Sequence, residues 1–234
     1  MVDYHVTYKK VKHITLRIMP DGRLEVTAPH RTGKAAIEDV IARKQHWILE
    51  HQKKAELLKQ ERSSESLHNS YCDGGQVAYL GRKYPLSATA EGKRSWNWDG
   101  TCLMLQGCAT EAQCRQMVEQ FYRHQMLQEI IPMLQQQVSE ILSALHLPEA
   151  EIKVRKMRSS WGICYSQLNK IVLNLWLAMA PPECIRQVMI HEYLHFCQNN
   201  HSAAFYALLQ QFEPQYRQLK HRLSVLVDLT EVSE

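Results

Sequence analysis

A pair of histidines four residues apart constrains this chain more than any other feature of its sequence. His191 and His195 enclose Glu192 in the pattern H-E-x-x-H. Residues four apart lie on one face of an α-helix, one turn apart, so a helix lets both imidazoles meet one metal ion. Glu192 then lies about 100° further around the helix, beside the metal and not on it. The pattern therefore predicts a helix that carries a metal site.

The residue types in this pattern are typical of a zinc site. Zinc lowers the pKa of a bound water toward about 7, and a carboxylate beside the metal can accept the proton of that water. We predict one Zn²⁺ per chain, with His191 and His195 as metal ligands and Glu192 as the catalytic base.

A third ligand is expected just beyond this helix. His201 follows His191 at plus ten, but in an unbroken helix it would point about 240° away from His195. Asn199 and Asn200 predict a break between them, because asparagine tolerates the left-handed conformation that ends helices. We therefore predict that His201 completes the metal site; the alternative is a surface histidine.

Two other zinc arrangements bear on this prediction. Metzincins share the plus-ten spacing, but they require a glycine where this chain has Gln198 and a downstream Met-turn, and no methionine follows Met189. A thermolysin-like site takes its third ligand from a downstream glutamate. Glu213 is the candidate for that role and stays open as the alternative to His201.

Hydrophobic periodicity and turn signals predict an α+β fold. The elements expected are a hairpin turning at residues 20–22, a helix at about 34–61, a polar loop at 62–70, a strand ribbon at 76–86, a hairpin turning at Asp99-Gly100, a helix from its cap Thr110 to about 146 with a kink at Pro132, strands at 151–157 and 170–176, a helix from Pro181-Pro182 to about 198, a helix capped by Ser202 and a terminal helix opened by Pro214. We expect a small β-rich part over residues 1–106 and a helix-dominated part with a small sheet over residues 107–234.

Composition and charge exclude some classes of protein. The chain is 45% hydrophobic and 22% charged, as is ordinary for globular proteins. Its central apolar run, Leu175 to Ala180, is far shorter than the roughly 18 residues of a membrane span. The start, MVDYHVTYKK, lacks the apolar core of a secretory signal, so a cytoplasmic location without membrane contact is expected.

Positive charge is concentrated near the start of the chain. Residues 1–60 carry 12 Lys and Arg against 7 Asp and Glu. This favours either a solvated surface or a weak contact with nucleic acid. One hypothesis is therefore a nucleic-acid-binding module with a structural zinc, although the aromatic residues of this segment, Tyr4, Tyr8 and Trp47, are too few to suggest a stacking platform.

Further motifs make the chain resemble the YgjP-like metal-dependent hydrolases, a zincin group near the SprT-like and WLM proteases. The resemblance rests on W-G-x-C at Trp161–Cys164, on L-N at Leu173–Asn174, and on N-H-S-x-x-F at Asn200–Phe205 around the H-E-x-x-H pattern. V-T-A-P and Y-L-G-R-K-Y fit nearer the front, so the likeness covers nearly the whole chain. It implies a zincin-like metallohydrolase domain over residues 107–234, with zinc on the three histidines and the glutamate as base.

The chain departs from the family's usual pattern at four positions, none of which is a metal ligand. Ser160, Ile163, Tyr193 and Tyr206 stand where the family usually has Arg, Ser, Leu and Trp. We expect these differences to affect the substrate cleft. Candidate contacts with the substrate or its oxyanion are Tyr193, Tyr206, Arg158, Trp161 and Gly162, where the glycine would allow a strand to pass close to the metal.

The function predicted from these features is a zinc metallopeptidase acting on a peptide or protein. An extended peptide is expected to pair with an edge strand of the small sheet, for which we take residues 170–176. The alternative is a hydrolase of a small anionic substrate such as a nucleotide phosphoanhydride. That alternative rests on a cluster of cations, Lys153, Arg155, Lys156 and Arg158, which forms either an anion-binding rim or a solvated edge strand.

Overall fold

The computed structural model describes residues 3–232 and divides into two compact units, Met1–Glu65 and Ser66–Glu234. The first unit contains β1 (Tyr4–Lys9), β2 (Thr15–Ile18), β3 (Leu24–Pro29), α1 (Lys34–Arg43) and α2 (Gln45–Glu65). Its sheet has the order β1-β3-β2, in which β2 and β3 form the expected antiparallel hairpin. The inward residues of β3 pack on the buried faces of both helices, and this core contains Leu24, Val26, Ala28, Ile37, Ile41 and Ile48.

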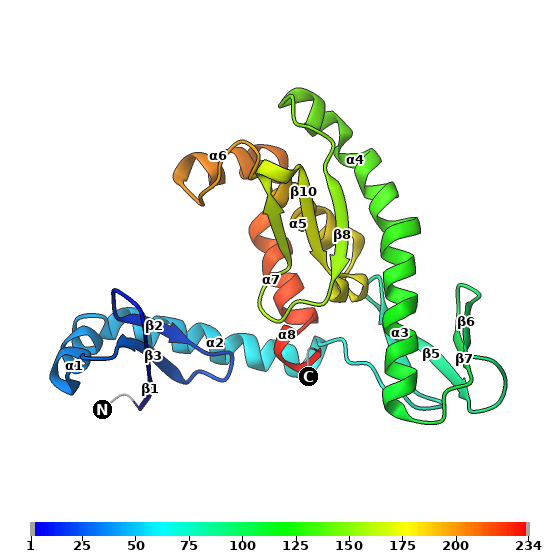
Figure 1. The fold of residues 1–234 in the computed structure, drawn as a ribbon, viewed down its shortest axis with the longest axis horizontal. Coiled ribbons are helices and arrows are strands. Elements are labelled where there is room, and N and C mark those ends of the chain that lie inside the picture. Colours follow the sequence, from blue (N-terminus) through cyan, green and yellow to red (C-terminus); the bar gives the residue numbers. More distant parts are fainter. Residues whose placement is uncertain (1–2, 233–234) are drawn as a thin grey trace. The chain divides into compact units, whose positions relative to one another are not determined.

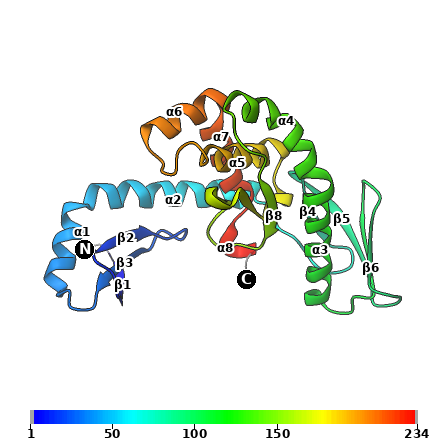
Figure 2. The same cartoon turned by 45° about the horizontal axis from the view of Figure 1, so that its top comes forward.

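The second unit starts with a sheet and a long helical segment. The sheet has the order β4-β5-β7-β6 and is built from β4 (Gln76–Tyr79), β5 (Arg82–Thr89), β6 (Ser95–Trp98) and β7 (Leu103–Gln106). The segment that follows consists of α3 (Glu111–Gln125), the π-helical turn Met126–Ile130 and α4 (Ile131–Ala144). Figures 1 and 2 show it as one continuous rod.

The remainder of the second unit carries the small sheet and the C-terminal helices. Its elements are β8 (Glu151–Arg155), β9 (Gly162–Tyr165), β10 (Lys170–Asn174), the 3₁₀ turns Ser166–Leu168 and Leu175–Met179, α5 (Pro182–Leu194), α6 (Ala203–Phe212), α7 (Tyr216–Leu226) and α8 (Leu229–Val232). The mixture of helices and small sheets confirms the α+β class.

The boundary between the two compact units lies at residue 65, whereas the sequence pattern suggested residue 106. The strands of residues 76–106 belong to the second unit because their inward side chains share its core. Leu86 and Leu103 are buried in the same cluster as Phe121 of α3. A sequence pattern shows that a strand has an apolar face, but it does not show which partner covers that face.

The helices differ in detail from the predicted ones. The single helix expected at about 34–61 is two helices, α1 and α2, with Lys44 between them. The polar segment expected to be a loop from residue 62 stays helical through Glu65, and the hydroxyls of Ser63 and Ser64 donate to carbonyls three residues back. In the long segment, Thr110 caps α3 as predicted, with its Oγ1 accepting from the Gln113 amide at 3.3 Å. The irregularity expected at Pro132 lies one turn earlier, in the π-helical turn, because proline has no N–H to donate back into that turn.

The small sheet has the order β8-β10-β9, so β10 is its central strand. It pairs in parallel with β8 and antiparallel with β9. The expectation that residues 170–176 offer an edge to a peptide is therefore wrong, because both edges of β10 are already paired. Within residues 3–232, the edge strand next to α5 is β9.

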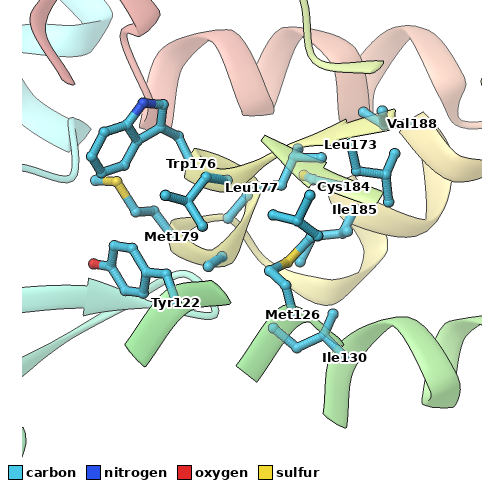
Figure 3. Packing of buried hydrophobic residues seen from close by; sticks show 14 of the residues in the cluster. Tyr122, Met126, Ile130, Leu173, Trp176, Leu177, Met179, Cys184, Ile185 and Val188 are labelled. Atoms are coloured by element: carbon cyan, nitrogen blue, oxygen red, sulfur yellow. The ribbon is translucent and has the colours of Figure 1, made fainter. Parts of the chain in front are cut away.

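Helix α5 is fixed in the core by its apolar side. Figure 3 shows Cys184, Ile185 and Val188 of this helix packed among side chains from β10 and from the turn that follows it. Met126 and Ile130 of the π-helical turn close the cluster from the opposite side. This packing leaves the other side of α5, with its two histidines, facing β9.

Candidate metal centre

The local sequence explains why the chain turns where the third histidine must meet the first two. Pro182 stands in the first turn of α5, where a missing N–H costs nothing, and the helix ends at Leu194 instead of near 198. The amides of Cys197 and Gln198 both donate to the Leu194 carbonyl, at 3.0 Å each. Ser202 then caps α6, its Oγ accepting from the Phe205 amide at 3.3 Å.

This turn brings the three predicted histidines together. One ligand atom from each of His191, His195 and His201 lies within 4.8 Å of the others. The Nε2 atoms of His191 and His201 are 3.0 Å apart. A tetrahedral zinc ion with bonds of about 2.0–2.1 Å separates its ligand nitrogens by about 3.3 Å. The cluster therefore fits a zinc ion without a change in the backbone.

Burial favours the neutral state, which a metal needs, for two of the three imidazoles. Burial lowers the pKa of His191 to about 3, with smaller contributions from the other two histidines. Burial also lowers the pKa of His201. A neutral ring keeps a lone pair for the ion, and a protonated ring does not.

Two neighbours orient the rings. The carbonyl of Gln198 lies 2.9 Å from His195 Nδ1, which makes that nitrogen the donor and leaves Nε2 for a metal. Phe205 is fully buried, and its ring lies 4.8 Å to 5.0 Å from the ring centres of all three histidines. Phe205 thus forms a common floor under the histidine cluster.

Glu192 lies beside the histidines in a nearly dry setting. Burial raises the pKa of Glu192 to about 7, and a hydrogen bond from the Cys164 amide of β9 acts in the opposite direction. The carboxyl borders an open cavity of about 310 Å³ that is also lined by the three histidines and by Gly162 to Cys164. A buried carboxyl with a pKa near neutrality next to a metal site is suited to accept and return a proton.

Gly162 sets the position of that carboxyl. A β-carbon on Gly162 would lie 2.5 Å from Cγ and 2.6 Å from Oε1 of Glu192, closer than side chains approach. The loop before Gly162 is itself fixed, because Asn174 Nδ2 donates to the carbonyls of Met157 and Ser160 at 2.8 Å each. The predicted close approach of the W-G segment is therefore an approach to Glu192.

Comparison with known proteins shows the family of the chain. The YgjP-like family, described as a metallopeptidase domain, matches residues 12–225 of the chain. The chain belongs to the YgjP-like family. The match spans both compact units and includes the histidines and Glu192, so the chain is a metallopeptidase-type hydrolase by family. No curated protein matches the chain. Among the described residues, no helix is both long and apolar enough to cross a membrane.

The remaining candidates of this YgjP-like domain lie at different distances from the histidine cluster. Glu213 is buried and forms an ion pair with Arg186, and it is not part of the histidine group. Tyr193 is 1% exposed and faces the core, because two residues correspond to about 200° around α5 from His191. Neither position fits the role considered for it, a metal ligand or an oxyanion contact.

The candidate contacts on the outer side of the site are divided between two cavities. Gly162 lines the histidine cavity, whereas Trp161 and Tyr206 line a second, neighbouring one. The ring of Tyr206 stacks on His201 at 6.1 Å. Arg158 is exposed and lines neither cavity.

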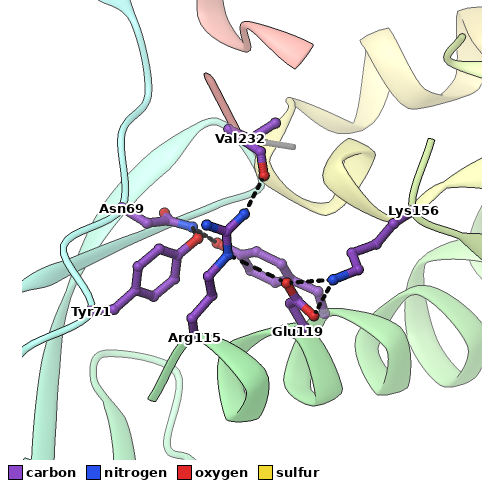
Figure 4. A network of polar contacts seen from close by, with 7 residues as sticks. Asn69, Tyr71, Arg115, Glu119, Lys156 and Val232 are labelled. Carbon is purple, nitrogen blue, oxygen red and sulfur yellow. Dashed lines mark hydrogen bonds and ion pairs between the residues drawn. The ribbon is translucent and has the colours of Figure 1, made fainter. Parts of the chain in front are cut away.

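The cations of residues 153–158 lie outside the histidine cavity. Lys153 pairs with Glu151 at 3.0 Å on β8, the edge opposite β9. Lys156 pairs with Glu119 of α3 at 2.9 Å, in a network in which Arg115 also binds the Val232 carbonyl (Figure 4). None of these cations lines the histidine cavity. Their positions fit a solvated edge strand and not an anion-binding rim at the metal site.

Sequence reasoning named Phe205 as the end of the N-H-S-x-x-F motif but gave it no role at the site. Phe205 follows His201 by four residues, but the two are not in one helix, because α6 begins after its cap Ser202. The spacing alone therefore did not place the Phe205 ring against His201. Sequence reasoning also missed the amide of Cys164, which carries no side-chain signal.

We expect Gly162→Ala to damage catalysis without removing the metal. The new methyl group must displace the Glu192 carboxyl, and a misplacement of about 1 Å can cost about 100-fold in rate. The measurement is kcat/KM on a cleaved peptide, together with zinc content by atomic absorption. Ile163→Ala is the neighbouring control, since it removes atoms and adds none beside Glu192. Equal activity of the Gly162→Ala variant and the wild type would contradict the role of this close approach.

Proposed function

We propose that this YgjP-like domain is a zinc-dependent peptidase in which His191, His195 and His201 hold the ion and Glu192 is the general base. The observation that carries the proposal is the meeting of three imidazoles, with one ligand atom of each within 4.8 Å of the others, next to a buried carboxyl. Structural zinc sites have four protein ligands, whereas three protein ligands leave a position for water or substrate. The donor set therefore favours a catalytic site.

The residues of the chain divide the chemistry among them. Zinc, when bound, supplies a charge that acidifies water and polarises the scissile carbonyl. Glu192 takes the proton of the attacking water and passes it to the leaving amine. A nearby cation lowers the pKa of a carboxyl, so Glu192 is ionised and ready to accept this proton at neutral pH. Gly162 and the Cys164 amide hold the carboxylate in place.

The substrate would bind along β9. Gly162 to Cys164 line the histidine cavity, and β9 pairs only with β10 among the described strands. An extended peptide added to this edge gains main-chain hydrogen bonds and passes the histidines and Glu192. This arrangement replaces β10 by β9 as the strand that receives the peptide.

Metal removal tests the proposal directly. Dialysis of the full chain against a chelator is expected to abolish peptide release from denatured casein, and one equivalent of zinc per chain is expected to restore it. The same preparations are incubated with nucleoside triphosphates. Release of phosphate without release of peptides would favour the phosphoanhydride alternative and contradict the peptidase.

A further inference from the structure

A second cavity lies next to the histidine cavity and has a different chemistry. It is open, has a volume of about 590 Å³, and is within the size range of ligand sites. Its walls carry aromatic and basic side chains. The aromatic ones are Trp161, Tyr206 and Tyr216, and the basic ones are Arg217, Lys220 and His221. We call it the cationic cavity. None of the described residues that line it is acidic.

The basic residues of this cavity come from one face of α7. Positions 217, 220, 221 and 224 follow helical spacing, so their side chains lie along one side of the helix, while Leu219 and Leu223 face the core. Arg217 is held against the wall: its Nε donates to the Tyr216 hydroxyl at 2.9 Å, and its guanidinium lies 5.6 Å from the centre of that ring. This stripe of side chains presents positive charge to the cavity.

The cationic cavity adjoins the metal site on two sides. The Tyr206 ring stacks on His201 at 6.1 Å and on Tyr216 at 6.0 Å, so stacked rings lead from the histidines to α7. On the other side, Trp161 of the cavity directly precedes Gly162, where the edge of β9 begins. The two distances between ring centres, 6.1 Å and 6.0 Å, together equal the length of about three or four residues of an extended chain, which rises about 3.3 Å per residue.

Lys220 lies in the middle of the face of α7 that lines the cavity, one turn from Arg217 and one turn from Ser224. Among the side chains that the structure describes, no carboxylate forms an ion pair with Lys220 Nζ. An ammonium group near a metal site and without an acidic partner is suited to bind an anionic group of the substrate.

We propose that the cationic cavity binds a carboxylate of the peptide substrate, within about four residues of the scissile bond, through Lys220 and Arg217. This inference rests on the proposed peptidase function. The carboxylate is that of an Asp or Glu side chain or that of the peptide's C-terminus, and both present the same group to the two cations. The aromatic walls would cover the aliphatic stem of the residue that carries it.

Matched peptides test the inference. A cleaved sequence is first found by digesting a peptide mixture with the zinc-loaded full chain and reading the products by mass spectrometry. Peptides with the same scissile bond are then compared with Glu or Gln at each nearby position, and with a free or an amidated C-terminus. Wild type is expected to lose about tenfold or more in kcat/KM when the recognised carboxylate is removed. A loss in a Glu-to-Gln pair identifies a side-chain carboxylate, and a loss on amidation identifies the carboxylate of the C-terminus.

Variants of the cavity complete this test. Lys220→Ala is expected to cleave acidic and neutral peptides at similar rates, Lys220→Arg to keep the preference, and Lys220→Glu to prefer a peptide with Lys at that position. Lys153→Ala, which removes a lysine at the far edge of the sheet, is the charge-matched control and is expected to behave as wild type. An acidic preference that is unchanged in Lys220→Ala and Lys220→Glu would overturn the inference.

A binding measurement separates this inference from the proposed function. In the zinc-loaded Glu192→Gln variant, fluorescence anisotropy of labelled peptides reports affinity without turnover. Carboxylate-dependent binding that is lost with Lys220→Ala supports the cavity even if no peptide is ever cleaved. Cleavage that is insensitive to carboxylates overturns the cavity and leaves the peptidase standing. A third outcome also overturns the inference: a nucleoside triphosphate binds more tightly than any acidic peptide, and neither ligand displaces the other.

Discussion

Glu192→Gln is expected to lower kcat/KM on a cleaved peptide by about 10²-fold to 10⁴-fold, the usual contribution of a general base. The amide keeps the size of the carboxyl and fits the space beside Gly162, but it cannot accept a proton. The three imidazoles are untouched, so zinc content is expected to stay at one ion per chain. Zinc analysis and steady-state kinetics on the same preparation measure both effects.

Glu192→Asp serves as the matched control for this prediction. It keeps the acid but draws it back by one methylene from its position next to Gly162, so an intermediate loss of rate is expected. A Glu192→Gln variant that turns over peptide as fast as wild type would show that this carboxyl is not the base. Loss of zinc from the same variant would show instead that the carboxyl supports the metal.

His201→Ala is expected to weaken zinc binding by more than about 100-fold, since even groups that only orient a metal ligand contribute about 10-fold to 100-fold. The Nε2 atoms of His201 and His191 are 3.0 Å apart, close enough for both to bind one ion. Competition with a fluorescent chelator measures the affinity. His221→Ala, which changes a histidine outside the metal cluster, is the matched control and is expected to keep zinc.

Glu213→Ala tests the alternative third ligand. Unlike His201→Ala, it is expected to leave zinc binding intact. Glu213 is buried in an ion pair with Arg186, so its removal leaves a guanidinium without its partner and is expected to lower Tm. Zinc affinity is expected to stay close to that of wild type. Loss of zinc in Glu213→Ala together with its retention in His201→Ala would make the site thermolysin-like and contradict the triad.

The features that the sequence predicted correctly depend on neighbours within a few residues. Thr110 and Ser202 cap helices, Asp99-Gly100 turns a hairpin, and Pro182 opens α5, because each acts on amides or torsions of its own turn. The place where a helix ends was less certain: α5 stops at Leu194 and α2 continues through Glu65. These ends depend on small free-energy differences to which packing also contributes.

The pairing of strands was beyond the sequence pattern. Residues 170–174 and 162–165 both have the composition of short strands, and nothing in either shows which one is central. The order β8-β10-β9 follows from contacts between segments far apart in the chain. It decides which edge can receive a peptide, and it places Lys153 and Arg155 on β8, the edge strand opposite β9.

The sequence by itself predicted that the three histidines meet and that Glu192 lies beside them, and the structure has this arrangement; their roles as metal ligands and base stay predictions. Their spacing on one helix, with a break before His201, leaves few arrangements in which they do not meet. Only the tertiary structure decided what surrounds them: the Phe205 floor, the close approach of Gly162 to Glu192, and the cationic cavity with Lys220. The physical reason is range. Helical periodicity acts over a few residues of one segment, whereas each of the two cavities is lined by segments far apart in the chain, which burial of a common core brings together: α5 and β9 for the histidine cavity, and α6, α7 and Trp161 for the cationic cavity.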